Sequence, residues 1–94
     1  MGSVAEHIAR VAEQVDAGAG DAEVQELLAA ARTRCAQEAA GAAPGQRRLL
    51  ANVQTALATW AEVWPRLGRQ REFRAAVARE ARLWSTRLAR PDRA

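Results

Sequence analysis

The sequence predicts an all-α fold, a four-helix up-down bundle built from two αα-hairpins. Its 94 residues contain abundant alanine but no tyrosine and one phenylalanine, a composition that favours helices and leaves little to build a sheet. Apolar residues recur at alternating three- and four-residue steps in four segments, as they do on one face of a helix. Short links join these segments, and short links favour antiparallel neighbours. A chain of this length forms one domain, residues 1–94, with a modest core, so completion of the bundle by homodimerisation is an open alternative.

The first predicted helix covers residues 3–17. Ser3 and Glu6 have the spacing of a capping box, in which each side chain accepts a hydrogen bond from the backbone of the other residue. Gly18 and Gly20 end the helix, because glycine adopts the left-handed conformation common after a helix end. The apolar stripe is narrow and consists of Val4, Ile8, Val11 and Val15. We therefore expect this helix either to pack loosely or to complete a bundle only within a dimer.

The second predicted helix covers residues 21–40. Asp21 is a good N-cap because its side chain can accept a hydrogen bond from the first turn. The stripe of this helix consists of Val24, Leu27, Leu28, Ala31 and Cys35. Residues 41–45 are the clearest break in the chain and predict a tight connection, with Pro44 or Gly45 starting the next helix.

The third predicted helix covers residues 46–64. Its stripe consists of Leu50, Val53, Leu57, Trp60 and Trp64, and the pattern continues to Leu67. Pro65 conflicts with that continuation, because the residue before a proline avoids the helical conformation. Two alternatives remain open. Either one helix is kinked near Pro65 and ends at Gly68, or the helix ends near Val63 and Pro65 opens the next one.

The fourth predicted helix covers residues 69–89, and residues 90–94 form a frayed tail. Its stripe consists of Phe73, Val77, Ala81, Trp84 and Leu88. Every aromatic residue of the chain belongs to the third or the fourth stripe. Because a short break joins these two stripes, we expect them to face each other as a helical hairpin with a tryptophan-rich core.

Charge is distributed unevenly along the chain. All fourteen basic residues are arginine, which we attribute to codon usage in a GC-rich bacterial genome rather than to selection for bidentate contacts. Residues 1–45 hold three arginines and seven acidic residues, whereas residues 46–94 hold eleven arginines and four acidic residues. This asymmetry predicts that the two halves attract each other or that the second half binds something acidic.

The sequence contains no pattern typical of an enzyme, a metal site or a cofactor site. His7 lies at the edge of the first stripe, and Cys35 lies on the second stripe as a small buried apolar residue would. Neither is accompanied by a nucleophile–base set, by metal-ligand spacing or by a phosphate-binding loop. We therefore expect no catalysis, no metal and no cofactor.

No segment has the roughly 20 apolar residues that a membrane span needs, and none resembles a signal peptide. The sequence therefore predicts a cytoplasmic protein without a membrane contact.

Glu80 is the one charged residue that falls among the apolar positions of the fourth stripe. A buried carboxylate destabilises a fold unless it is paired. We interpret Glu80 as a residue at the margin of the stripe that pairs with an arginine of the third helix. The alternative is a polar contact that specifies the register of the bundle or a binding partner.

Tryptophan and arginine, which are enriched at protein interfaces, gather where the third helix meets the fourth. Trp64 adjoins the chain break there, so we expect its side chain to be partly exposed. The candidate partner-binding residues are Trp64, Arg66, Arg69, Arg71, Arg74 and Arg82.

These residues predict a small non-catalytic protein–protein interaction module, such as an adaptor, a regulator or an assembly subunit. Its partner would be another protein or a second copy of the chain, and Trp64→Ala or Arg71→Glu would weaken association without unfolding. The alternative is non-specific nucleic-acid binding through the arginine-rich second half.

Overall fold

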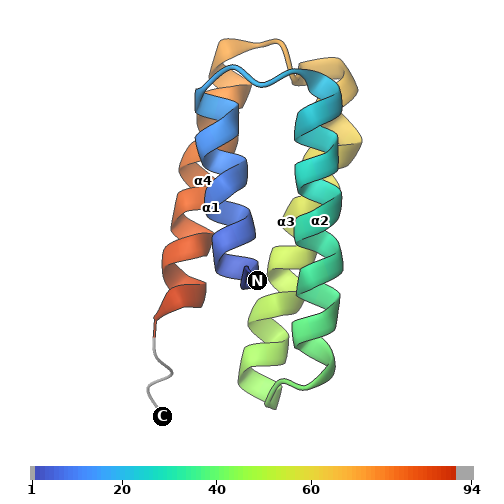
Figure 1. The fold of residues 1–94 in the computed structure, drawn as a ribbon, viewed down its shortest axis with the longest axis vertical. Helices are drawn as coiled ribbons and strands as arrows, with labels where there is room; N and C mark the ends of the chain where they lie inside the picture. The colour runs from blue at the N-terminus through green and yellow to red at the C-terminus, as the bar shows by residue number, and fades with distance from the viewer. Residues whose placement is uncertain (1, 91–94) are drawn as a thin grey trace.

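The computed structural model describes residues 2–90, and these residues form four helices joined by short links. The helices are α1 (Val4–Asp16), α2 (Asp21–Ala40), α3 (Pro44–Leu67) and α4 (Arg71–Ala89). They run alternately up and down in an elongated bundle (Figure 1), which confirms the predicted four-helix architecture. No strand occurs within residues 2–90, and no helix there is long and apolar enough to cross a membrane. The tail predicted over 90–94 lies, apart from Arg90, outside the described residues.

The helices pair differently from what the aromatic stripes suggest. The most extensive contact joins α1 to α4, followed by the contacts of α2 with α3 and of α1 with α2. Figure 1 accordingly shows α1 beside α4 and α2 beside α3. The contact between α3 and α4 is the least extensive of the four. Their stripes nevertheless belong to one core, in which the rings of Trp64 and Phe73 meet, and α1 packs against both α4 and α2.

Helix α1 is a central element of the core, and the expectation that it packs loosely is wrong. Ile8 and Val11 have no exposed surface at all. Ala5 and Ala12 are also buried, so the apolar face is wider than the valine and isoleucine spacing indicates. Small side chains at these positions allow a neighbouring helix to approach closely, in keeping with the extensive α1–α4 contact.

The start of α1 is held from two directions. The predicted capping box is present, since the Ser3 hydroxyl accepts from the Glu6 N–H and the Glu6 carboxylate accepts from the Ser3 N–H. In addition, the Val4 N–H donates to Glu38 Oε2 of α2 at 2.9 Å. Three backbone N–H groups at this helix end, those of Ser3, Val4 and Glu6, thus have partners. The capping box predicts two of these hydrogen bonds, whereas the bond from Val4 to Glu38 follows from the packing of α1 on α2.

The helix boundaries agree with the predictions with small differences. Gly18 has a φ of 87° and ends α1 in the left-handed conformation, as predicted, whereas Gly20 has an ordinary φ of −74°. Gly20, not Asp21, is the N-cap of α2, so the prediction that Asp21 caps this helix is wrong. The Asp21 carboxylate is engaged elsewhere, because it accepts a hydrogen bond from Trp64 of α3.

Helix α3 begins at Pro44, two residues earlier than the predicted range, and it runs through Pro65 to Leu67. Of the two alternatives for this region, the single helix that ends at Gly68 is therefore the one observed. Continuation past Pro65 keeps Trp64 on the inner face of α3, in line with the rest of its stripe.

Candidate functional site

Five of the six candidate residues, all except Arg82, gather at the end of the bundle that holds the α1–α2 link (17–20) and the α3–α4 link (68–70). Trp64 lies at the centre of this end and is fully buried, so the expectation of partial exposure is wrong. Its indole Nε1 donates to Asp21 Oδ1 at 3.1 Å, and its ring lies 5.4 Å from that of Phe73, centroid to centroid. Because burial removes Trp64 from any surface, its contribution to a binding site is to support the residues above it.

Gly68 is required by the position of the Trp64 side chain. A Cβ atom on Gly68 would lie 2.4 Å from Trp64 Nε1, closer than a Cβ approaches any atom in real structures. The backbone of Gly68 is ordinary, with a φ of −64°, so a left-handed conformation is not the reason for glycine here. The α3–α4 link therefore lies directly against the indole.

Arg74 holds the two links together. Its guanidinium donates to the carbonyl oxygens of Gly68 at 2.9 Å, of Val15 at 3.0 Å and of Ala19 at 3.0 Å. It also lies 5.3 Å from the centroid of the Trp64 ring, which is cation–π geometry. These carbonyls lie at and just beyond the C-terminal ends of α1 and α3, where a cation is stabilised by the helix dipoles. Arg74 is therefore a positioning residue for this end of the bundle.

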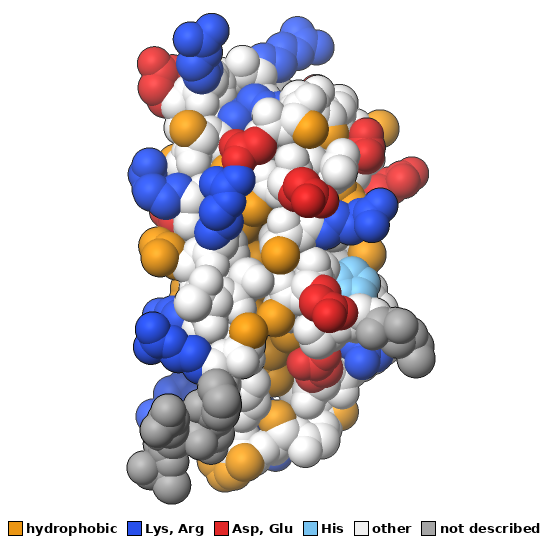
Figure 2. Space-filling model, turned by 60° about the vertical axis from the view of Figure 1, so that its left-hand side comes forward, with side chains coloured by type: hydrophobic (Ala, Val, Ile, Leu, Met, Phe, Trp, Pro, Cys, Tyr) orange, Lys and Arg blue, Asp and Glu red, His pale blue; other side chains and the backbone are white. Residues whose placement is uncertain are grey.

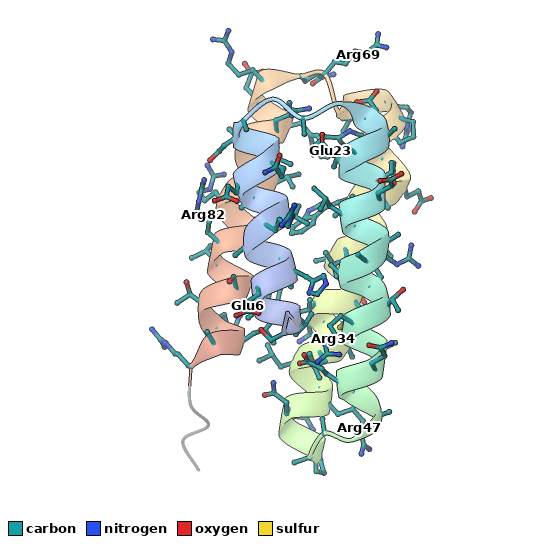
Figure 3. The ribbon with its side chains drawn as sticks, in the orientation of Figure 1. Glu6, Glu23, Arg34, Arg47, Arg69 and Arg82 are labelled. Atoms are coloured by element: carbon teal, nitrogen blue, oxygen red, sulfur yellow. The ribbon has the colours of Figure 1, made fainter. Side chains whose placement is uncertain are left out.

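Three of the predicted arginines remain available to a partner, and we call Arg66, Arg69 and Arg71 the arginine rim. All three side chains are exposed. Within residues 2–90 none of them takes part in a side-chain hydrogen bond or an ion pair. Figure 3 shows Arg69 pointing away from the bundle at the linked end. A shallow hollow of about 370 Å³ beside the rim is lined by Arg69, Arg71, Arg74, Asp16, Val15, Gly18 and Ala75.

Arg82 is not part of the rim. It lies along the side of the bundle (Figure 3) and forms an exposed ion pair with Asp16 across the α1–α4 contact. The structure thus divides the six predicted residues into a support (the buried Trp64 and the half-buried Arg74), an exposed rim, and one residue that pairs on another face.

The residues with reactive side chains do not come together. His7 Nδ1 lies 2.9 Å from the Ser3 carbonyl oxygen, whereas Cys35 is buried and its Sγ donates to the Leu50 carbonyl oxygen at 3.2 Å. Burial raises the pKa of the Cys35 thiol, and the nearby Glu38 raises it further, which keeps the thiol protonated and unreactive. Among the described residues no three His, Cys, Asp or Glu side chains form a group that could hold a metal ion.

Glu80 is exposed at the margin of its stripe, as the first interpretation has it. The ion pairs within residues 2–90 do not include Glu80, so the predicted pairing with an arginine of α3 is absent there. With its carboxylate in water, Glu80 has no need of a partner, because exposed ion pairs stabilise a fold little.

One exposed feature is missing from the sequence-based site. Leu83 is 60% exposed and is the one large apolar side chain with high exposure among the described residues. The neighbouring Trp84 is half-buried, with the Arg87 guanidinium 5.1 Å from its ring centroid. The signal for Leu83 was present in the sequence, since it is a leucine that lies off the apolar stripe of its helix.

Comparison of the chain with known protein families, with curated proteins and with solved structures found no match.

Proposed function

We propose that this protein is a small non-catalytic interaction module, an adaptor, regulator or assembly subunit, that binds an acidic surface of another protein through the arginine rim. The observation that carries the proposal is the contrast between Arg74 and the rim. Arg74 has its donors occupied by three carbonyl oxygens, whereas Arg66, Arg69 and Arg71 are exposed without intrachain partners among the described residues. Arginine suits this role because its planar guanidinium pairs with carboxylates in a bidentate manner.

The charges around the rim favour a protein partner over nucleic acid. Asp21 and Glu23 begin α2 at the same end of the bundle, and Glu72 lies beside Arg71. Figure 3 shows Glu23 and Arg69 at this common end. A polyphosphate backbone would meet both signs of charge here, whereas a protein surface can match a mixed pattern. We accordingly propose a bacterial cytoplasmic protein that binds protein, and treat nucleic acid as the competing outcome.

The rim rests on a rigid base, which lowers the entropic cost of binding. Trp64 is fully buried beneath the links. The Arg74 guanidinium lies over the Trp64 ring and donates to backbone carbonyl oxygens of both links, those of Gly68 and Ala19. Association therefore has to order the arginine side chains but not the backbone of the links, which loses less conformational freedom than ordering a mobile loop would.

Site-specific photo-crosslinking tests the proposal. A photoreactive phenylalanine analogue replaces Gln70, between Arg69 and Arg71, and the protein is irradiated in its source cells. The matched control carries the analogue at Ala29, an exposed residue of α2. We expect a discrete protein adduct from position 70 alone, and we expect Arg69→Glu with Arg71→Glu to abolish it. Equal adducts at positions 70 and 29, or an adduct insensitive to the charge reversal, would reject the rim as the binding site.

A titration with duplex DNA separates the competing outcome. Fluorescence anisotropy of a labelled duplex, measured from about 0.05 M to about 0.2 M salt, reports binding to phosphate by its steep salt dependence. We expect no binding at about 0.2 M salt. Tight binding that falls steeply with salt and is lost in the rim variant would replace the protein-interaction proposal with nucleic-acid binding.

A further inference from the structure

One face of the molecule, made by α1 and α4, carries segregated charge. Figure 2 shows acidic side chains along one side of this face and basic side chains along the other. The acidic row is exposed on α1 and consists of Glu6, Ala9, Glu13 and Asp16. The basic row is exposed on α4 and consists of Arg71, Ala75, Arg79, Arg82, Thr86 and Arg90. Both rows advance in steps of three and four residues, so each follows one side of its helix. Arg10 on α1 and Glu72 on α4 are the exposed residues of opposite sign next to these rows.

Within residues 2–90, four of these charges, those of Glu13, Arg71, Arg79 and Arg90, have no side-chain partner. Arg82 pairs with Asp16, and it is the one ion pair between α1 and α4 among residues 2–90. Glu6, Glu13, Arg79 and Arg90 form no ion pair there. Among the described residues, the face therefore presents the carboxylate of Glu13 and the guanidinium groups of Arg79 and Arg90 without partners, whereas Glu6 accepts from the Ser3 N–H.

The strip between the two rows is lined by small side chains. A shallow hollow of about 350 Å³ lies along it, bordered by Ala9, Glu13, Arg82, Ser85 and Thr86. The alanine, serine and threonine of this lining leave room for another helix face to approach closely. A flat face of this kind can accept a second helix pair.

Symmetry determines which second face is complementary. Ser85 Oγ donates to the Ala5 carbonyl oxygen, and Arg74 donates to that of Val15, so α1 and α4 run antiparallel in fixed register. In this register Glu13 of α1 lies level with Val77 of α4. Arg79 is two residues beyond Val77, so Glu13 and Arg79 differ in height along the bundle axis by about 3 Å. A two-fold axis parallel to the helices places α1 of one copy over α4 of the other. Glu13 then faces the partner subunit's Arg79, and the contact occurs twice.

We propose that the chain forms a symmetric homodimer through this α1–α4 face. The two-fold axis perpendicular to the helices is excluded by charge, because it would place the two basic rows against each other. The arginine rim lies at the end of the bundle, outside most of this face, so the dimer leaves Arg66 and Arg69 available. The inference goes beyond the proposed function and does not depend on it.

Solution mass tests the dimer directly. Size-exclusion chromatography with light scattering at about 0.1 mM protein and about 0.05 M salt should give about twice the chain mass of 10.2 kDa. At about 1 M salt the mass should fall to that of the single chain, because salt screens exposed charges. A single-chain mass under both conditions overturns the proposal, and so does a dimer that persists unchanged in high salt.

Charge reversal identifies the face. Glu13→Arg and Arg79→Glu should each give the single-chain mass at low salt, with circular dichroism showing an unchanged helix content. The double variant should dimerise again, and an equimolar mixture of the two single variants should form a heterodimer, because each mixed contact then joins opposite charges. Arg32→Glu on the exposed side of α2 is the matched control and should remain dimeric.

Other outcomes reject this face. A dimer retained by both single variants would place the interface elsewhere, and a peak that carries nucleic acid removable by salt would make the basic row a phosphate-binding surface. These results concern Glu13 and Arg79. Because Arg71 belongs to both the rim and the basic row, the photo-crosslinking is repeated with Arg69→Glu alone, a change outside the dimer face. Failure of one proposal is therefore distinguishable from failure of the other.

Discussion

The side chain of Gln25 supplies the hydrogen bond that Pro65 cannot give to Ala61. In a regular helix the N–H of residue 65 would donate to the carbonyl oxygen of residue 61, but proline has no N–H. Gln25 Nε2 of α2 instead donates to the Ala61 carbonyl oxygen at 3.0 Å. Helix α3 continues to Leu67 as a result, with its freed acceptor satisfied by the neighbouring helix.

Replacement of Gln25 should therefore destabilise the fold through this carbonyl. We expect Gln25→Ala to lower the free energy of unfolding by about 1–2 kcal/mol, because a partly buried acceptor loses its donor. In a Pro65→Ala background the same change should cost much less, since an alanine at this position restores the helical N–H. Urea denaturation of the four proteins gives the coupling between the two sites. Additive effects of the two substitutions would contradict this account.

Loss of Arg74 should destabilise the linked end of the bundle. Arg74→Met removes three hydrogen bonds to carbonyl oxygens and the cation over the Trp64 ring. We expect a loss of about 2–3 kcal/mol in the free energy of unfolding, measured by urea denaturation with tryptophan fluorescence. Arg71→Met, at an exposed site of the same helix, should change stability by less than about 0.5 kcal/mol. Equal effects of the two variants would remove the positioning role of Arg74.

Alanine should be poorly tolerated at Gly68. The added Cβ would lie 2.4 Å from Trp64 Nε1, so the buried indole must shift. We expect Gly68→Ala to destabilise the protein by about 1–3 kcal/mol through overpacking. Gly41 is the matched control, because its Cβ would meet no atom within 4 Å and its φ is −110°. Gly41→Ala should leave the denaturation midpoint unchanged or raise it slightly, and a similar loss at both positions would argue against the steric explanation.

The buried thiol of Cys35 should make stability depend on alkaline pH. Burial, and then the charge of Glu38, raises the pKa of this thiol in the folded protein above its ordinary value of 9.0. Below that value the thiol is neutral in both states and contributes no pH dependence. As pH rises above it, the unfolded chain ionises first, so the free energy of unfolding falls until the folded pKa is passed.

Denaturation midpoints measured from about pH 7 to about pH 10 check this dependence. The wild-type midpoint should fall more steeply above pH 9.0 than that of Cys35→Ala, which has no thiol to ionise. The comparison concerns the slopes and not the absolute stabilities, because the alanine variant also loses packing. Parallel slopes would show that the Cys35 thiol is not the group responsible.

The burial of Trp64 changes one expectation drawn from the sequence. The sequence predicts that Trp64→Ala weakens association without unfolding, but a fully buried tryptophan supports the core. Truncation at such a site typically lowers stability by about 3–5 kcal/mol, so Arg69 and Arg71 are the better probes of binding.

Local patterns along the chain specify the four helices and most of their ends. The Ser3–Glu6 capping box, the left-handed Gly18 and the apolar stripes depend on residues only a few positions apart, so they can be recognised without knowledge of the packing. The pairing of the helices is different, because α1 packs most extensively on α4 whereas α3 and α4 make the smallest contact. The partners of Gln25, Asp21 and Arg74 likewise follow from packing, since they lie 36, 43 and as many as 59 positions away. A helical period specifies which face of each helix is apolar, but the choice among several apolar faces depends on how closely their side chains can pack.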